Sequence, residues 1–163
     1  MRIAVILENI RSVHNVGSIF RTADALGAEK VYCCGITPGP LDRFKNVRTD
    51  FAKVALGAER SVRWEAGLKI KETIGALKKD GWCIFAIEQA KNSILYYKAF
   101  DAEKSNAKIA FILGTETDGI LPATLALADK VVEIPMHGKK ESLNVAVAFG
   151  IVAFRLRDGV VQS

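Results

Sequence analysis

The chain has 163 residues, of which 50% are hydrophobic and 25% charged, as in one ordinary globular domain with its own core. Lys and Arg number 23 against 18 Asp and Glu, and the net charge of +5 suits either a polyanionic partner or a solvated basic surface. This composition excludes a disordered or low-complexity chain, and no apolar run is long enough to span a membrane.

The first residues indicate no secretion signal, because the apolar run 1–7 has only the length of a strand and Glu8 ends it. Cys33, Cys34 and Cys83 are odd in number and lack the spacing of a metal site, which is typical of a reducing compartment. We therefore expect a single domain over residues 1–163 that acts in the cytoplasm.

Short apolar strands alternate with helical segments along the chain. We expect strands at residues 3–7, 31–34, 61–64, 83–87, 109–113 and 131–134, and helices at 16–26, 68–79, 122–128 and 143–156. The alternation predicts an α/β fold with a mostly parallel sheet flanked by helices. Ligands bind at the carboxyl ends of such strands, so a site is expected in the loops after Leu7, Ile87, Leu113 and Ile134.

The last predicted helix is apolar almost all round, since Asn144 is its only polar side chain between Leu143 and Phe154. A surface helix would keep one polar face, so this one must be covered on every side. At helical spacing, two opposite faces could divide between the core and an interface. One face holds Val145, Phe149 and Val152, and the other holds Leu143, Val147 and Phe154.

The commoner sites for nucleotides, metals and hydrolysis are not indicated. The loop 114–119 has the glycine spacing of a P-loop, but Ile120 and Leu121 replace its Lys and Ser/Thr, and its acids would repel a triphosphate. No turn carries the dinucleotide pattern G-x-G-x-x-G. His14 and His137 lie far apart, so no metal site is expected, and Ser142 lacks the G-x-S-x-G elbow of hydrolases.

Three stretches near the predicted strand ends combine glycine with polar residues. The first, N-x-G-x-x-x-R, places Asn15 as a helix cap, Gly17 where another group can approach, and Arg21 away from the apolar stripe. The second is G-x-E-x-x-G at 114–119. The third is I-P-M-x-G-x-x-x-S-L-N-V at 134–145, with Ser142 as a helix cap. Taken singly, each also suits a capped helix or an acidic turn.

In this order, the three stretches closely resemble the signature motifs of the SpoU/TrmH branch of the SPOUT RNA methyltransferases, over essentially the whole chain. Residues 53–58, K-V-A-L-G-A, are also similar to a short K-x-x-x-G-A stretch of that family. The resemblance implies a single SPOUT domain at 1–163 with a deep C-terminal trefoil knot and without the appended RNA-binding domain of many relatives. It further implies S-adenosyl-L-methionine as cofactor, methylation of a ribose 2′-hydroxyl in RNA, and a homodimer without membrane or metal.

The resemblance also implies the roles of individual residues. Arg21 would act on the 2′-hydroxyl, Asn15 would help hold Arg21 and the substrate, and Glu116 would buttress the site. Ser142 and Asn144 would shape the site from the helix start. An arginine stays protonated, so we expect Arg21 to stabilise the developing oxyanion and not to act as a base. Cofactor contacts are implied for Ile87, Glu88, Leu113, Gly114, Glu116, Ile134, Met136, Ser142, Leu143 and Asn144.

Basic residues in the first part of the chain are the expected phosphate contacts of RNA, and Lys139 with Lys140 could add to them. The first group comprises Arg11, Arg43, Lys45, Arg48, Lys53 and Arg60. Recognition by the catalytic dimer alone favours tRNA slightly over rRNA. Two alternatives remain, a non-catalytic RNA-binding or assembly factor that retains the knotted fold and a small-molecule methyltransferase. The intact motif residues disfavour the first, and the basic patch disfavours the second.

Overall fold

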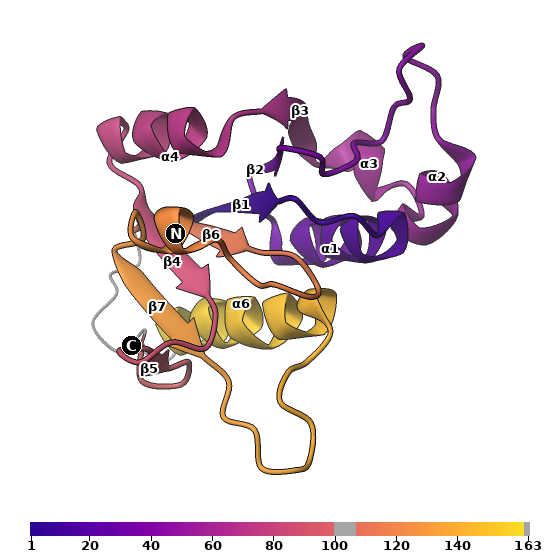
Figure 1. Ribbon diagram of the computed structural model, residues 1–163. Helices are drawn as coiled ribbons and strands as arrows, with labels where there is room; N and C mark the ends of the chain where they lie inside the picture. Colours follow the sequence, from indigo (N-terminus) through magenta and orange to yellow (C-terminus); the bar gives the residue numbers. More distant parts are fainter. Residues whose placement is uncertain (100–106, 162–163) are drawn as a thin grey trace.

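The computed structural model describes residues 1–99 and 107–161, which form an α/β fold (Figure 1). Within these residues, seven strands make one sheet in the order β3-β2-β1-β6-β4-β7-β5, and every neighbouring pair is parallel. The strands are β1 Arg2–Glu8, β2 Lys30–Cys34, β3 Arg63–Leu68, β4 Cys83–Ile87, β5 Ile94–Leu95, β6 Lys108–Leu113 and β7 Lys130–Glu133. The helices are α1 Val13–Leu26, α2 Thr49–Ala55, α3 Ala58–Ser61, α4 Ile70–Lys79, α5 Pro122–Leu125 and α6 Val145–Val161. The expected parallel α/β fold is confirmed.

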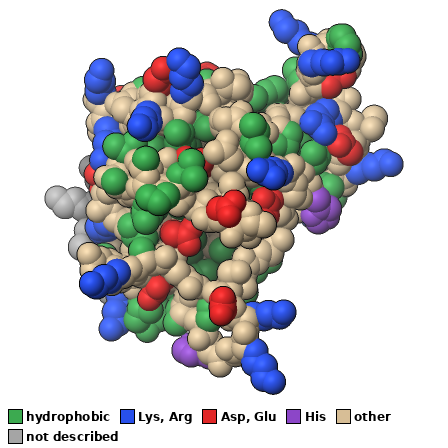
Figure 2. Space-filling view, in the orientation of Figure 1, with side chains coloured by type: hydrophobic (Ala, Val, Ile, Leu, Met, Phe, Trp, Pro, Cys, Tyr) green, Lys and Arg blue, Asp and Glu red, His purple; other side chains and the backbone are tan. Residues whose placement is uncertain are grey.

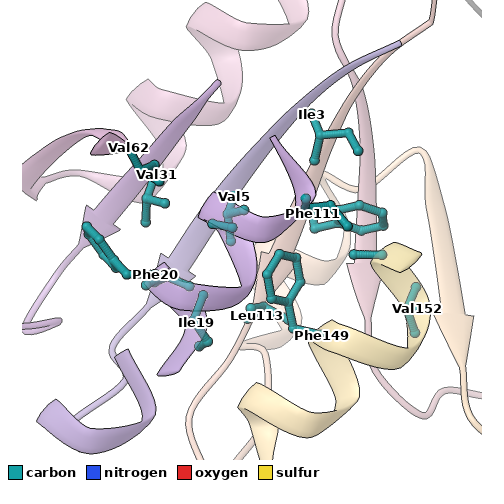
Figure 3. Packing of buried hydrophobic residues seen from close by; sticks show 14 of the residues in the cluster. Ile3, Val5, Ile19, Phe20, Val31, Val62, Phe111, Leu113, Phe149 and Val152 are labelled. Atoms are coloured by element: carbon teal, nitrogen blue, oxygen red, sulfur yellow. The ribbon is translucent and has the colours of Figure 1, made fainter. Parts of the chain in front are cut away.

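The core lies on both faces of the sheet, because side chains alternate along each strand. In β1, Val5 and its odd-numbered neighbours pack against α1, α2 and α6, whereas Ile6 lies in a second cluster with α4. Figure 3 shows Phe149 of α6 beside Phe111 of β6, and their ring centroids are 6.1 Å apart. Burial on both faces explains why β1 and β6 read as almost continuous apolar runs.

Three predicted elements differ from the structure. The strand predicted at 61–64 lies at Arg63–Leu68, because Ser61 ends α3 and donates its hydroxyl to Asp24. The helix predicted from residue 68 begins at Ile70, since Leu68 is still in β3. The helix predicted at 122–128 ends at Leu125, after which two turns lead into β7.

The two predicted helix caps are also wrong, and the reason bears on function. Ser12 caps α1, with its hydroxyl accepting a hydrogen bond from the backbone N–H of Asn15. At α6, the side-chain oxygen of Asn144 accepts from Ala146 N at 2.9 Å and Val147 N at 3.4 Å, so this helix begins at Val145 and not at residue 143. Asn15 is left with its side chain available for other contacts, while Ser142 remains in the preceding loop.

Helix α6 lies beside α1 and divides as its sequence predicts (Figure 1). Phe149 and Val152 are fully buried, and Val145 is half-buried. The opposite face is exposed. It comprises Val147 at 50%, Ile151 at 37% and Phe154 at 39%, with Leu143 at 38% in the loop just before the helix, and together we call these residues the outer face of α6. A single chain therefore covers only one side of this helix.

Candidate active site

A cavity of about 340 Å³ opens at the carboxyl ends of β4, β6 and β7. This is the edge where the strand order predicts a ligand. All ten residues expected to contact the cofactor line it. They are Ile87, Glu88, Leu113, Gly114, Glu116, Ile134, Met136, Ser142, Leu143 and Asn144. Further lining residues, such as Gln89, Thr115 and Ala148, come from the same loops or from α6 but carry no separate sequence signal.

The loop after β6 forms one wall of the cavity and folds closely on itself. Thr115 and Gly119 exchange two backbone hydrogen bonds, of 3.0 and 3.2 Å. A Cβ atom added at Gly114 would lie 2.2 Å from the carbonyl carbon of Gly119 and 2.4 Å from the nitrogen of Ile120. Only glycine fits at position 114, because the atoms in the way belong to the backbone.

Two carboxylates hold this loop, and they lie at the ends of β4 and β1, the strands on either side of β6. Glu88, after β4, accepts a hydrogen bond from Ile120 N at 2.8 Å. Glu8, at the end of β1, is only 1% exposed and accepts from Leu121 N and from the hydroxyl of Thr124. Sequence reasoning missed Glu8 as a site residue, although an acid ending a buried strand was the available signal. The loop is therefore fixed before any ligand arrives.

A chain of side-chain hydrogen bonds joins the three sequence motifs at the cavity. Asn15 donates from Nδ2 to Glu116 Oε1 at 2.9 Å, and Asn144 donates from Nδ2 to Asn15 Oδ1 at 3.0 Å. The backbone N–H of Ser12 also donates to Glu116. Asn15 is only 8% exposed, and it is the centre of this arrangement. Residues from α1, from the loop after β6 and from the start of α6 thus form one unit.

The structure does not bring Arg21 into this unit. Arg21 is exposed on α1 and does not line the cavity, and the side chain of Asn15 bonds to Glu116 and Asn144 and not to Arg21 as expected. Ser142 and Asn144 do line the cavity. Among the residues expected to be catalytic, Asn15, Glu116, Ser142 and Asn144 therefore meet within one chain, while Arg21 lies outside.

Comparison with known proteins assigns the family. Residues 2–154 match the SpoU rRNA methylase family. The chain belongs to the SpoU rRNA methylase family. The match covers all three motifs and the strands that carry the cavity, so the resemblance seen in the sequence is confirmed.

Named relatives of this SpoU chain are longer than it is. A 23S rRNA (guanosine-2′-O-)-methyltransferase RlmB of Ralstonia nicotianae is 34% identical over 151 residues, which are 92% of this chain and 56% of the relative. The RlmB of Neisseria meningitidis is 32% identical over 153 residues, 94% of this chain and 57% of the relative. The chain spans just over half the length of these relatives.

Solved structures share the SpoU fold. A TrmH/SpoU tRNA modifying enzyme of A. aeolicus superposes with a TM-score of 0.82 at 25% identity, over 98% of this chain and 76% of that one. An AdoMet-bound rRNA methyltransferase from Sinorhizobium meliloti gives a TM-score of 0.84 at 25% identity, over 96% of this chain and 56% of that one.

The Glu116 carboxyl of this SpoU site has a pKa below its ordinary value. Partial burial acts to raise the pKa, but the hydrogen bonds from Asn15 and from backbone N–H groups, including those of Ser12 and Arg11, outweigh it. Glu116 is therefore a carboxylate at neutral pH. It can accept hydrogen bonds but cannot donate one.

Charge is arranged unevenly around the SpoU cavity. Figure 2 shows acidic side chains around the hollow at the centre of this face, and Lys and Arg on the loops that protrude on either side. Arg48 forms an ion pair with Asp50, with 2.9 Å between nitrogen and oxygen, and the corresponding distance from Arg60 to Glu59 is 3.8 Å. The other expected phosphate contacts are exposed. They are Arg11, Arg43, Lys45, Lys53, Lys139 and Lys140.

Neither a metal centre nor a membrane segment is found in the described parts of this SpoU chain. Residues 1–99 and 107–161 contain no group of three His, Cys, Asp or Glu side chains placed to hold a metal ion. No helix in these same ranges has the length and apolar character needed to cross a bilayer.

Proposed function

We propose that the chain is an S-adenosyl-L-methionine-dependent RNA methyltransferase that acts on a ribose 2′-hydroxyl. The observation that carries the proposal is the hydrogen-bonded unit of Glu116, Asn15 and Asn144 at the cavity. These residues come from opposite ends of the chain, 101 and 129 positions apart, and a purely structural cap would not need them to converge on a cavity.

The cavity fits the cofactor in size, lining and charge. Its 340 Å³ lies within the range of small-molecule sites, of roughly 300–1,000 Å³. Leu113, Ile134 and Met136 supply apolar surface for an adenine ring. The acidic lining complements a cationic ligand and opposes a polyphosphate. When bound, S-adenosyl-L-methionine supplies an electrophilic methyl group on a positively charged sulfur.

The unit centred on Asn15 is suited to orienting a hydroxyl group. One N–H and the carbonyl oxygen of its amide are already used by Glu116 and Asn144, which fixes the amide plane. Asn15 itself does not line the cavity, so a ligand there would meet Glu116 and Asn144, the two side chains that Asn15 holds in place. The residues of this chain would thus align the hydroxyl, and alignment alone can contribute about 7–11 kcal/mol to catalysis.

We further propose that a second copy of the chain completes the site. The outer face of α6 is apolar and exposed, as an interface between copies would be before assembly. Arg21 is exposed on α1, the helix beside α6, and lies outside its own cavity. In a homodimer, Arg21 would reach the cavity of the partner chain and stabilise the developing oxyanion there.

We also propose that the C-terminal part forms the trefoil knot of the family. Two observations support a crossed path. The chain leaves β6 for α5, which packs on the α4 side of the sheet, and returns after β7 to α6 on the α1 side. The loop after β6 is also fastened to Glu88 and Glu8 while α6 passes beside it.

RNA is the proposed substrate because exposed cations flank the acidic cavity (Figure 2). The curated relatives are named for 23S rRNA, and two structural neighbours are named for tRNA. The relatives thus do not support the slight preference for tRNA expected from the sequence. Mapping of the modified nucleosides in RNA from cells that lack the protein would identify the type of RNA.

The second candidate is an RNA-binding or assembly factor without activity, and calorimetry separates the two. Titration with S-adenosyl-L-methionine should give saturable binding to one site per chain. A chain that binds RNA but shows no heat with the cofactor would be the non-catalytic factor. A chain that methylates a small molecule but no component of total RNA would support the small-molecule enzyme instead.

A further inference from the structure

Phe44 is the most exposed large apolar side chain among the described residues, at 68%. It lies at the tip of the loop between β2 and α2, which protrudes from the carboxyl edge of the sheet (Figure 1). Ile36 and Val47 in the same loop are 61% and 52% exposed. Exposing an aromatic ring at a protruding tip has no benefit for folding, so a binding role has to be considered.

The tip is held in one conformation by its own hydrogen bonds. A single oxygen of Asp42, Oδ1, accepts from Phe44 N at 2.8 Å and from Asn46 N at 2.9 Å. Leu41 and Val47 pair as an antiparallel bridge. The ring is therefore presented by an ordered backbone, which reduces the entropy lost when a partner binds.

Arg43 lies against the ring, and a second cation is its neighbour in sequence. The guanidinium carbon of Arg43 lies 4.7 Å from the centroid of the Phe44 ring, and Lys45 follows in sequence. Arg43 and Lys45 form no ion pair with any residue in 1–99 or 107–161, whereas Arg48 pairs with Asp50. An exposed aromatic ring beside exposed cations suits a nucleic-acid base with its phosphates, because the ring can stack on the base while the cations pair with the phosphates.

The base of the loop is fastened to the segment that carries the candidate active site. Thr37 accepts from Ile10 N at 3.1 Å and donates to the carbonyl oxygen of Leu7. Asn9 accepts from Ile36 N. This segment continues into α1, where Asn15 meets Glu116. The base of the loop is thus fastened to the segment that leads to the cavity.

We infer that Phe44 is a stacking platform for an unpaired base of the RNA substrate, with Arg43 and Lys45 on the adjoining phosphates. The inference rests on the proposed function and adds a requirement to it, that the substrate has a single-stranded nucleotide in addition to the target ribose. A duplex would not satisfy the platform, because its bases are stacked on one another and its deep groove is narrow.

The test compares Phe44→Ala, Phe44→Leu and Phe44→Trp, with Ile36→Ala as the matched control in the same loop. Binding is measured at one ionic strength to a short single-stranded oligoribonucleotide of mixed sequence and to the same strand annealed to its complement. Phe44→Ala should weaken single-strand binding by about 5- to 150-fold, the usual effect of losing one stacked base. Duplex binding should change little.

The other variants show whether the π-face is what matters. Phe44→Leu should be as weak as Phe44→Ala, and Phe44→Trp should keep the affinity and lose fluorescence when single-stranded RNA binds. The inference is overturned if Phe44→Leu binds like the unmodified chain, if Ile36→Ala loses as much as Phe44→Ala, or if sedimentation shows that Phe44→Ala changes the number of chains in the assembly.

The same variants separate this inference from the proposed function. If the unmodified chain methylates RNA and Phe44→Ala leaves KM unchanged, the platform is wrong and the proposed function stands. If the unmodified chain binds no S-adenosyl-L-methionine while Phe44→Ala still lowers single-strand binding, the platform stands and the enzyme proposal fails.

Discussion

The side-chain amide of Asn15 bonds to two residues: its nitrogen donates to Glu116, and its oxygen accepts from Asn144. The sequence predicted it as a helix cap, and the structure gives that task to Ser12. Local pattern could not show the difference, because the two partners of Asn15 lie more than 100 positions away in sequence. The family resemblance did place Asn15, Glu116 and Asn144 in one site, where the structure brings them together.

Replacement of Asn15 should lower methyl transfer without changing the fold. Asn15→Ala removes both hydrogen bonds, and Asn15→Asp keeps the size and the acceptor but sets a second carboxylate against Glu116. A hydrogen bond to a charged group such as the Glu116 carboxylate contributes about 1.5–3 kcal/mol, so we expect loss of the orientation it gives to lower activity by roughly 10- to 150-fold in both variants. Initial rates measure this, with circular dichroism as the control. An Asn15→Asp variant of full activity would remove Asn15 from the site.

The lowered pKa of Glu116 predicts how the stability of the fold depends on pH. Since its pKa is lowered in the folded chain, its hydrogen bonds stabilise the fold fully above the ordinary pKa of a glutamate, and this stabilisation is lost as the pH falls through the lowered value. The melting temperature of Glu116→Gln should therefore lie below that of the unmodified chain at neutral pH. The gap should shrink in acid. A gap of constant size from neutral to acid pH would contradict this.

The elements that sequence predicted best are those buried on both sides. Strands β1, β4 and β6 are apolar runs, and each was placed to within one residue at its carboxyl end. The sheet edges were harder. Strand β3 is mostly exposed and shows no alternation, and β5 has only two residues. Helix α2 has seven residues and is stabilised by Phe51 packing on Phe20 of α1. The sequence of α2 alone does not predict this contact.

The loop after β6 gives the sharpest prediction for an element. Gly114→Ala would push a methyl group into the backbone of Gly119 and Ile120 and displace the cavity wall. We expect affinity for S-adenosyl-L-methionine to fall by at least about tenfold, which is about 1.4 kcal/mol. Gly138→Ala, in the other loop near the cavity, meets no atom within 4 Å and is the matched control. Calorimetry of both variants checks this. Equal affinities would show that the cofactor does not use this wall.

In a single chain the candidate cavity is formed, but an apolar face of one helix is left uncovered. The outer face of α6 remains exposed in one chain, and Arg21 lies away from its own cavity. The proposed homodimer, whose active sites would take residues from two chains, would explain both features. Sequence reasoning reached the division of α6 from spacing alone, but the partner of its outer face lies beyond what one chain can show.

Mixing two variants with different defects tests this arrangement, at a concentration of S-adenosyl-L-methionine too low to fill the Gly114→Ala cavity. Arg21→Ala chains should bind S-adenosyl-L-methionine normally and transfer no methyl group, while Gly114→Ala chains should bind it weakly. Refolded together, they should recover about a quarter of the activity of an equal number of unmodified chains if the mixed dimers, half of the total, each carry one intact site. The Arg21→Ala variant mixed with Val147→Glu, which charges the outer face, should recover none. A refolded mixture that is no more active than the two separate variants would refute a shared site.

Transfer of an isotopically labelled methyl group to RNA tests the central claim most directly. The chain is incubated with labelled S-adenosyl-L-methionine and total RNA from cells that lack the protein, and the digested nucleosides are analysed by mass spectrometry. The account predicts label on the ribose 2′-oxygen of one nucleoside and none with Arg21→Ala. Label on a base, or RNA that stays unlabelled although the chain binds the cofactor, would contradict it.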